Sequence, residues 1–398
     1  MIKKDVAYDE IKKDRSNNVM KKEEKIAILQ DIVRIKSVND NEGEVAVYLK
    51  NLLESYGIEG KLISYANGRD NLVASYKKGN EGKVLGLSGH MDVVAAGDES
   101  MWSCKPFSAE IKGNRLYGRG TTDMKSGLAA MVIAMIELKE AEKKFNGTIK
   151  LLATVGEEIG ELGSEQLTRK GYANDLDGLI IGEPTNYNLM YTHMGSINYT
   201  VVSKGKEAHS SMPQEGYNAI NHLNEFITKA NMRMTQIAET YKNPILGKTI
   251  HNVTVISGGN QVNSIPSQAK LQGNIRSIPE FPNDQVIALL QKLIDELNEE
   301  TEYRLELTID YNKIPVKANP ASSLIDCIQE QFKRPLPLVG AAGTTDAAEF
   351  VKAANEFDFI VFGPGVATLP HQIDEYVEID NYLDMIEKYQ AIILSYLA

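Results

Sequence analysis

The sequence predicts an α/β protein with a mostly parallel sheet flanked by helices, interrupted by an inserted domain of the α+β class. The length of 398 residues exceeds what one hydrophobic core usually supports, which favours two domains. Short β-rich runs alternate with helical stretches toward both ends of the chain, as in a parallel sheet covered by helices. Between about Gly195 and Asp310 this alternation gives way to a different order of elements.

The alternating segments contain the elements of the expected sheet. An early helix is indicated by apolar residues at helical spacing, and Gly57 can end it in the left-handed conformation. Its apolar residues are Val45, Tyr48, Leu49, Leu52, Leu53 and Tyr56. A further helix is expected from Ser126 to about Lys143. The expected strands are the runs "NLVASY", "KVLGLSG", "TIKLLATV", "GLIIG" and "FDFIVFG".

The inserted segment has its own pattern. Strand-forming and helix-forming runs follow one another there in the order β-α-β-β-α-β, which is typical of a ferredoxin-like domain. Because α/β elements resume after it, we expect one domain built from residues 20–194 and 311–398 and a second over residues 195–310. Residues 1–19 are polar and lack periodicity, so we expect them to form a loose extension.

Composition and charge narrow the class of function. The formal net charge of −11 argues against a nucleic-acid partner, and it means that an anionic substrate needs locally placed positive charge. The apolar runs are too short for a membrane helix and no signal-peptide pattern opens the sequence, so we expect no membrane partner. The two cysteines, Cys104 and Cys327, form no CxxC pair. Their arrangement argues against a disulfide scaffold or a cysteine zinc site and favours a cytoplasmic location.

Polar residues that can bind a metal gather at the carboxyl ends of the expected strands or in nearby loops. They are His90, Asp92, Asp123, Glu157, Glu158, Glu183 and His371. Ligands of open α/β sheets bind beyond the carboxyl ends of the strands, so we expect these residues to converge. Taken singly, each has a plainer explanation: His90 as a loop residue, the paired glutamates as a solvated face, and Asp123 as a helix cap. Only six histidines occur, however, and two accompany several acidic residues at one edge, which predicts a metal site.

The ligand types indicate which metal would bind. Histidine and carboxylate without cysteine suit Zn²⁺, with Co²⁺ or Mn²⁺ as substitutes. Two histidines and several carboxylates suggest two ions about 3.5–4 Å apart, which would acidify a water and polarise a carbonyl. Asp92 lies two residues from His90, so in an extended segment it is placed to accept the imidazole N–H. Of the adjacent pair Glu157–Glu158, one carboxylate is expected to bind metal and the other to take the proton of the water.

Several longer motifs resemble those of the acetylornithine deacetylase / succinyl-diaminopimelate desuccinylase family, a metallopeptidase group that also contains aminoacylases and a bacterial carboxypeptidase. The motifs are "SGHMDVV", "WSCKPFSAEIKGNRLYGRGTTDMKSG", "GEEIGELGS", "GEPT", "AHSSMPQEGYNAI", "NSIPSQAKLQGNIRS" and "GTTDAAEF". The resemblance extends from about Met20 to the C-terminus and implies a zinc-exopeptidase-like fold. The implied metal ligands are His90 with Glu183, Glu158 with His371, and a bridging Asp123. The resemblance also implies that Asp92 orients His90 and that Glu157 is the general base.

The inserted domain of this family is a ferredoxin-like lid through which such enzymes commonly dimerise, so the resemblance implies a homodimer. His209 matches the lid histidine that reaches the partner subunit's active site and stabilises the tetrahedral oxyanion. Asn263 and Arg276 match residues that hold a substrate carboxylate, and the Arg276 guanidinium offers a bidentate fork for it. Gly343 and Thr344 match a loop that gives the substrate hydrogen bonds.

The implied reaction removes an N-acyl group from an amino acid, with a small anionic N-acyl amino acid as substrate. Desuccinylases tend to carry an aromatic residue at the position of Met212, so "HSSMPQEGYNAI" looks more like deacetylases. In contrast, "WSCKPFSAEI" and "GRGTTDMKSG" look more like desuccinylases. N-succinyl-LL-2,6-diaminopimelate, on the route to lysine and cell-wall precursors, is the first expected substrate. N-acetylornithine is the second, and the substrate of a dipeptidase or aminoacylase is the third.

Other classes of function remain as alternatives or are disfavoured. A noncatalytic metal-binding paralogue would be expected to lack the general base or a ligand, and none is lost here. No GxSxG nucleophile elbow occurs, which argues against a serine hydrolase. Neither GxGxxG nor GxxxxGK[ST] occurs, which argues against a nucleotide-dependent enzyme.

Overall fold

The computed structural model describes residues 20–398, which form two compact units. The first unit contains the described residues up to Met190, Asn319–Leu338 and Lys352–Ala398, and the second contains Tyr191–Ala318 and Val339–Val351. The chain therefore enters the second unit twice. The extension expected over residues 1–19 lies outside the described residues. The domain limits expected from the sequence stay a prediction.

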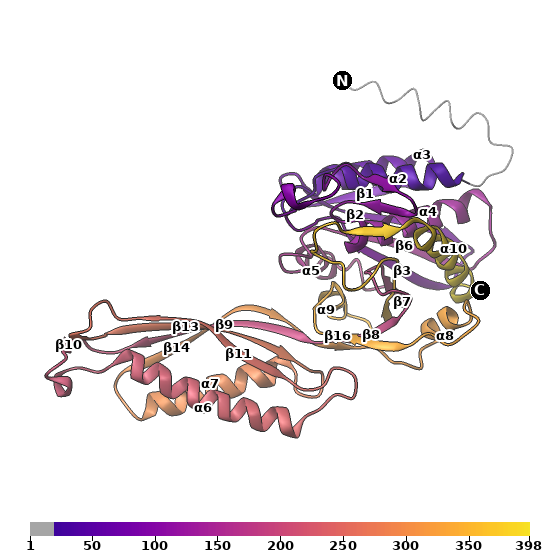
Figure 1. The fold of residues 1–398 in the computed structure, drawn as a ribbon. Helices are drawn as coiled ribbons and strands as arrows, with labels where there is room; N and C mark the ends of the chain where they lie inside the picture. Colours follow the sequence, from indigo (N-terminus) through magenta and orange to yellow (C-terminus); the bar gives the residue numbers. More distant parts are fainter. Residues whose placement is uncertain (1–19) are drawn as a thin grey trace. The chain divides into compact units, whose positions relative to one another are not determined.

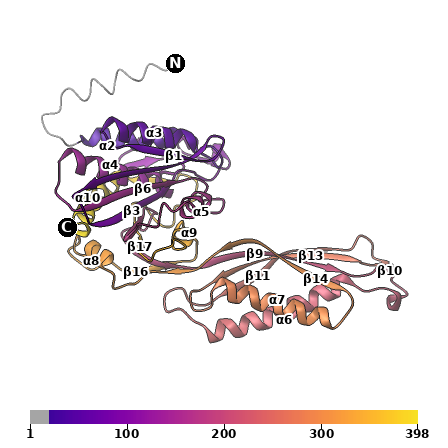
Figure 2. The same ribbon diagram turned by 180° about the vertical axis from the view of Figure 1, so that it is seen from behind.

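A mixed sheet forms the centre of the first unit (Figures 1 and 2). Four parallel strands lie in its middle in the order β6-β3-β7-β17. Antiparallel strands β2 and β1 extend it beyond β6, and the start of β8 pairs with β17 on the other side. The strands are β1 (Gly60–Ala66), β2 (Arg69–Lys78), β3 (Lys83–His90), β6 (Gly147–Thr154), β7 (Gly178–Ile181), β8 (Leu189–His193) and β17 (Asp358–Val361). The α/β class with its largely parallel sheet is confirmed.

Helices pack on this sheet. α3 lies against β1 and β2, α4 against β3 and β6, and α10 against α4 and β3. The helices of this unit are α2 (Lys22–Arg34), α3 (Gly43–Ser55), α4 (Ser126–Glu140), α5 (Leu162–Arg169), α8 (Ser323–Gln329) and α10 (Ile379–Tyr396). Gly57 follows α3 with φ of +71°, as the sequence predicted, and α4 ends slightly before the predicted limit. Among residues 20–398, no helix is both long and apolar enough to cross a membrane.

A small antiparallel sheet lies beside the loops that carry several polar residues of the first unit. Its strand order is β18-β5-β4, and Arg115 pairs with Glu378 across β5 and β18. The strands are β4 (Glu110–Lys112), β5 (Arg115–Tyr117) and β18 (Tyr376–Glu378). This sheet joins two segments that are far apart in the sequence.

The second unit contains a four-stranded antiparallel sheet in the order β11-β13-β9-β14, with α6 and α7 side by side on one face (Figure 1). Along the chain the order is β9-α6-β11-β13-α7-β14, which is the predicted β-α-β-β-α-β pattern. The main elements are β9 (Gly195–Lys204), α6 (Ala219–Thr240), β11 (Ile250–Gly258), β13 (Gln268–Ser277), α7 (Asn283–Glu299) and β14 (Arg304–Lys313). Shorter elements are β10 (Ala208–His209), β12 (Ser264–Ile265), β15 (Val316–Lys317), β16 (Leu338–Ala341) and α9 (Ala347–Phe350). The separate antiparallel domain expected from the sequence is confirmed.

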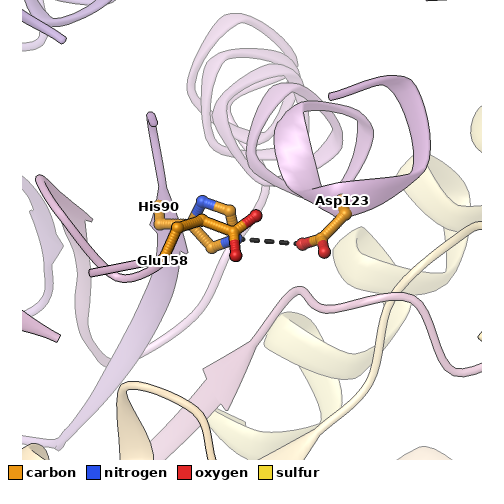
Figure 3. A group of neighbouring side chains, drawn as sticks. All are labelled: His90, Asp123 and Glu158. Carbon is orange, nitrogen blue, oxygen red and sulfur yellow. Dashed lines mark hydrogen bonds and ion pairs between the residues drawn. The ribbon is translucent and has the colours of Figure 1, made fainter. Parts of the chain in front are cut away.

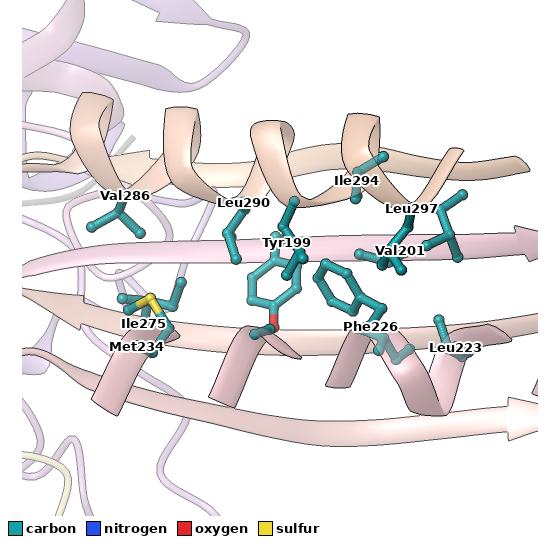
Figure 4. Close-up of a cluster of buried hydrophobic side chains, with 14 of the residues drawn as sticks. Tyr199, Val201, Leu223, Phe226, Met234, Ile275, Val286, Leu290, Ile294 and Leu297 are labelled. Atoms are coloured by element: carbon teal, nitrogen blue, oxygen red, sulfur yellow. The ribbon is translucent and has the colours of Figure 1, made fainter. Parts of the chain in front are cut away.

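The core of the second unit explains this arrangement (Figure 4). Alternate residues of β9, namely Ile197, Tyr199 and Val201, are fully buried, because a strand directs every second side chain to the same face. Phe226 of α6 and Leu290 of α7 are equally buried and belong to the same cluster. Apolar residues recur at every second position of the strand and at every third or fourth position of the helices. The apolar faces formed in this way pack against each other in one core.

Candidate metal centre

The carboxyl ends of the parallel strands carry the predicted metal-binding residues of the first unit. His90 is the last residue of β3, Glu157 and Glu158 follow β6 closely, and Glu183 follows β7. His371 lies in the loop between β17 and β18. Because the strands that precede these residues run parallel, their loops emerge at one edge of the sheet.

His90 is completely buried, and its two ring nitrogens have different partners. Nδ1 lies 2.9 Å from the backbone carbonyl oxygen of Asp92, which can only accept a hydrogen bond. This contact assigns the proton of the neutral ring to Nδ1 and leaves the lone pair of Nε2 for a metal. Nε2 faces Oδ1 of Asp123 at 3.0 Å and Oε1 of Glu183 at 3.5 Å.

Asp123 lies between the two histidines. Its Oδ1 is 3.0 Å from Nε2 of His90, as Figure 3 shows, and its Oδ2 is 3.5 Å from Nε2 of His371. The residue lies in the turn Thr121–Lys125 before α4 and has non-helical dihedral angles (φ −115°, ψ 98°). The N-cap of α4 is Lys125, which makes no side-chain capping bond, so Asp123 does not cap that helix. A carboxylate that presents one oxygen to each of two histidines is suited to bridge two ions.

The paired glutamates have different neighbours. Both carboxylate oxygens of Glu158 lie close to Nε2 of His371, at 3.1 and 2.9 Å. Glu157 instead belongs to a group with His90 and Glu183 in which one ligand atom of each residue lies within 4.8 Å of the others. A second group, within the same limit, contains His90, Asp123 and Glu158 (Figure 3). The two adjacent glutamates therefore differ in their neighbouring side chains. Glu157, like Glu158, lies near enough to a histidine to bind a metal.

The pKa values of the cluster reflect both burial and the closeness of several carboxylates. Burial, with the neighbouring Glu183 and Glu158 carboxylates, raises the pKa of Glu157 well above its ordinary value. Burial likewise raises the pKa of Glu183 well above its ordinary value, and Asp123 adds to the rise. Hydrogen bonds with Asp123 and Glu158 raise the pKa of His371 to about 10. Burial and the neighbouring carboxylates thus favour the protonated forms of the two glutamates, whereas divalent cations would favour their ionised forms.

The donor set fits a pair of Zn²⁺-type ions. It offers imidazole nitrogens and carboxylate oxygens from the five residues of the two groups and from His371 beside Glu158, and the Nδ1 of His90 is already engaged. Neither group of candidate ligands in the described chain contains a cysteine. Such ligands suit Zn²⁺, Co²⁺ or Mn²⁺ better than metals that prefer thiolate.

Asp92 contacts its neighbours differently from the sequence expectation. Its backbone carbonyl faces Nδ1 of His90 at 2.9 Å, whereas its nearest carboxylate oxygen is 3.6 Å from that nitrogen. The carboxylate instead accepts the backbone N–H groups of Glu157 and Glu158, both at 3.1 Å. Burial raises the pKa of Asp92 to about 6. Asp92 therefore contacts His90 through its main chain and the loop of the paired glutamates through its side chain.

Two further residues beside the cluster were not singled out from the sequence. Arg119 and Glu375 form a buried ion pair in which Nη1 lies 2.6 Å from Oε2. Arg119 precedes Asp123 by four residues in "GRGTTD", and Glu375 follows His371 by four residues in "HQIDE". Both residues lie in irregular segments, and no periodicity in the sequence identifies them.

Three of the other predicted site residues lie on strands or loops of the second unit. His209 is exposed at the end of β10, and its Nδ1 accepts the backbone N–H of Ser211 at 3.2 Å. The proton of its neutral ring is therefore on Nε2. Asn263 is exposed, and its carbonyl accepts the N–H of Ser210, so it lies next to the His209 turn. Arg276 is half-buried in β13, and within residues 20–398 its guanidinium has no ion-pair or side-chain hydrogen-bond partner.

Gly343 and Thr344 follow β16 in the part of the second unit that returns from the first. Gly343 is exposed, and a Cβ built there would meet no atom within 4 Å. Thr344 is half-buried. The structure thus brings together the predicted residues of the first unit, while the five predicted residues of the second unit lie on that unit's own strands and loops.

Comparison of the whole chain with known proteins gives consistent results. The model of peptidase family M20/M25/M40 matches residues 86–395. A probable succinyl-diaminopimelate desuccinylase of Staphylococcus epidermidis is 41% identical over 406 aligned residues, covering 95% of this chain and 99% of the relative. A protein of the same description from Staphylococcus aureus is 39% identical, covering 94% of this chain and 98% of the relative.

Solved structures share the fold at lower sequence identity. An aminopeptidase of Bacillus cereus is 20% identical with a TM-score of 0.77, covering 96% of this chain and all of that one. A family M20 metallo-carboxypeptidase of Sulfolobus solfataricus is 20% identical with a TM-score of 0.76, covering 94% of this chain and 99% of that one. The family model, the relatives and the cluster of histidines and carboxylates agree. The chain belongs to peptidase family M20/M25/M40 and is a metallohydrolase.

Proposed function

We propose that the chain is a dinuclear amidohydrolase that converts N-succinyl-LL-2,6-diaminopimelate and water to succinate and LL-2,6-diaminopimelate. The main support for a metal-dependent hydrolase is the position of the Asp123 carboxylate. It presents one oxygen to each of the two histidines, beside a pair of glutamates. The succinyl substrate is supported by the description of the relatives that are 41% and 39% identical.

In this proposal His90 and Glu183 would hold one ion, Glu158 and His371 would hold the other, and Asp123 would bind both. The distances between the side chains of each pair, 3.5 Å and 2.9 Å, support the assignment. Two Zn²⁺ ions, or Co²⁺ or Mn²⁺ as substitutes, would polarise the amide carbonyl and make a water more acidic.

Glu157 is assigned the proton transfers. It lies beside the ligand cluster, and each ion of the proposal has its ligands without it. Its carboxylate takes one proton from water as the water oxygen attacks the amide carbon. It then delivers that proton to the amide nitrogen as the C–N bond breaks. The products are one carboxylic acid and one amine, which at neutral pH become a carboxylate and an ammonium group by proton exchange.

The second unit supplies groups suited to an anionic substrate. The Nδ1 atom of His209 makes the contact with Ser211, so the Nε2–H group on the other side of the ring is available to donate a hydrogen bond to an oxyanion. The Arg276 guanidinium, which has no partner among residues 20–398, suits a substrate carboxylate. Asn263, Gly343 and Thr344 are proposed to give the substrate further hydrogen bonds.

We further propose a homodimer formed through the second unit. β11 lies at the edge of its sheet, where the unpaired backbone groups of a strand can pair with another chain. Several apolar side chains of this strand are exposed: Ile250 by 46%, Val255 by 51% and Ile256 by 57%. An exposed apolar edge of this kind is stabilised when a second copy covers it.

His209→Ala is expected to lower kcat by about 10²–10³, because it removes one hydrogen-bond donor to the oxyanion. Metal content should stay at the wild-type value, since His209 lies outside the metal cluster. If His209 acts in the partner's site, a mixed dimer of His209→Ala and Glu157→Gln chains contains one complete site. Co-expression with two different tags and purification of the mixed dimer should then recover measurable hydrolysis. An inactive mixed dimer of folded, metal-loaded chains would show that His209 does not act across subunits.

Arg276→Lys is expected to raise KM or lower kcat/KM for the succinyl substrate although the positive charge is kept. Lysine presents a point charge and cannot form the two parallel hydrogen bonds of a guanidinium with a carboxylate. Steady-state kinetics with wild type and variant measure the change. Arg304→Lys is a matched control, because that arginine is exposed and its guanidinium already binds backbone carbonyls. Equal kinetics in Arg276→Lys and wild type would remove Arg276 from the substrate site.

A substrate panel tests the proposed function as a whole. Purified metal-loaded protein should hydrolyse N-succinyl-LL-2,6-diaminopimelate with a higher kcat/KM than N-acetylornithine and a neutral dipeptide. Preference for the dipeptide by more than about tenfold, or 1.4 kcal/mol, would instead indicate a peptidase. Metal binding without hydrolysis of any member of the panel would indicate a noncatalytic paralogue.

A further inference from the structure

Arg119 and Glu375 form a buried ion pair between the two loops that carry Asp123 and His371. Their side chains are 3% and 0% exposed. Arg119 belongs to the segment between β5 and the Asp123 turn, and Glu375 immediately precedes β18. The two residues are 256 positions apart, so the contact is a product of the tertiary fold.

The Glu375 carboxylate fixes the backbone at Asp123. Its Oε1 accepts the N–H of Thr122 at 2.8 Å and the N–H of Asp123 at 3.0 Å, while its Oε2 accepts from Arg119. Breaking these bonds would leave buried donors without partners, which is energetically costly. The peptide group from which the Asp123 side chain extends is therefore held in one orientation.

The Arg119 guanidinium fixes the backbone at His371. Its Nη2 donates to the carbonyl of His371 at 3.3 Å, and its Nη1 donates to the carbonyl of Gln372 at 3.2 Å. His371 has φ of +64°, a left-handed conformation that is uncommon for a residue other than glycine. A residue in such a conformation depends on its surroundings to stay there. One guanidinium thus connects the His371 backbone to the carboxylate that holds Asp123.

Stability alone is a weak explanation for this pair. A buried ion pair often contributes little net stability, because the cost of removing both charges from water offsets their attraction. Arg115 and Glu378 lie directly opposite each other on β5 and β18, with 3.9 Å between their charged atoms and side chains that are 45% and 38% exposed. That pair already links the same two segments without contacting Asp123 or His371. Only the buried pair reaches the candidate ligands.

We propose that Arg119 and Glu375 are positioning residues that hold Asp123 and His371 at the separation at which both bind metal. This inference rests on the proposed dinuclear site. The pair acts through the main chain and contacts no ligand side chain. Because Asp123 is the proposed bridge, its orientation affects both ions, and the pair couples the binding of one ion to that of the other.

The test is metal binding by Glu375→Gln and Arg119→Lys, compared with the matched control variants Glu378→Gln and Arg115→Lys. Glutamine places an NH₂ group opposite either the guanidinium or the two backbone N–H groups, so a donor faces a donor. Lysine keeps the charge of Arg119 but cannot reach both carbonyls. Metal-free protein is titrated with Co²⁺ in a calorimeter, and thermal unfolding of the metal-free protein checks that each variant is folded.

Glu375→Gln is expected to weaken Co²⁺ binding by about 10–100-fold, which is typical for the partners of metal ligands. Arg119→Lys should weaken binding less, and excess Co²⁺ should restore its hydrolytic activity. Both control variants should bind Co²⁺ as the wild type does. Unchanged Co²⁺ affinity in either folded variant of the buried pair would overturn the proposal.

Other outcomes are also decisive. If Glu375→Gln does not fold, Arg119→Lys decides the question. If neither folds while both controls do, the pair serves the fold alone and the proposal is wrong. If the wild type itself binds no Co²⁺, the dinuclear site and the proposed function fail together. If the wild type binds two ions and the variants match it, only the positioning role fails.

Discussion

Removal of metal is expected to abolish amide hydrolysis. The first unit contains two groups of candidate ligands, each with His90 and two carboxylates whose ligand atoms lie within 4.8 Å of one another. Burial, together with the neighbouring carboxylates, raises the pKa values of Glu157 and Glu183. Without cations the carbonyl of a substrate would meet an anionic site that cannot stabilise a developing oxyanion. Prolonged dialysis against a strong chelator should therefore reduce hydrolysis of the succinyl substrate to background.

The measurement follows activity and metal content together. Elemental analysis should show metal loss in parallel with activity loss, and addition of Zn²⁺ or Co²⁺ should restore both. Mg²⁺ is a useful control, because it prefers octahedral oxygen coordination and is expected to restore little activity at a site with two histidines. Full hydrolysis by protein that elemental analysis shows to be metal-free would refute the dinuclear model.

The fold was predictable where apolar residues follow a period. The run "GLII" of β7 is buried at every position, whereas the apolar residues of β9 that are fully buried, Ile197, Tyr199 and Val201, lie at alternate positions. The first pattern is typical of an inner strand of a parallel sheet and the second of a strand with one covered face. The short strands β15 and β16 were not predicted, because two to four residues carry too little periodicity. The return of residues 339–351 to the second unit depends on long-range pairing, which local patterns do not contain.

The convergence of the candidate ligands was predictable for a different reason. The carboxyl ends of parallel strands lie at one edge of a sheet. Polar residues just after those strands therefore lie close together, even when the conformations of the connecting loops are unknown. The contacts behind the ligands were not predictable in this way. The main-chain carbonyl of Asp92 contacts the His90 ring, and its side chain accepts hydrogen bonds from two backbone N–H groups. Which group makes which contact depends on the dihedral angles of the loop. The pairing of Arg119 with Glu375 likewise joins two irregular segments, and no periodicity specifies it.

Glu157→Gln is expected to lower kcat by about 10²–10⁴, the usual contribution of a general base. The substitution keeps the size of the side chain and removes only its ability to take a proton. Since each proposed ion has its ligands without Glu157, metal content should stay near two ions per chain. Glu165→Gln is a suitable control, because it makes the same chemical change on the exposed side of α5.

Glu158→Gln should give the opposite result, because the two carboxylates are adjacent in sequence but have different neighbours. Glu158 lies 2.9 Å from His371, so replacing it removes a proposed ligand, and metal content should fall below two ions per chain. Excess metal should then restore part of the activity of Glu158→Gln and none of the activity of Glu157→Gln. Glu157 also lies in a potential ligand group with His90 and Glu183, which makes the comparison informative. If Glu157→Gln loses metal and Glu158→Gln keeps it, the roles within the pair must be exchanged, and the proton would have to be carried by the carboxylate beside His371.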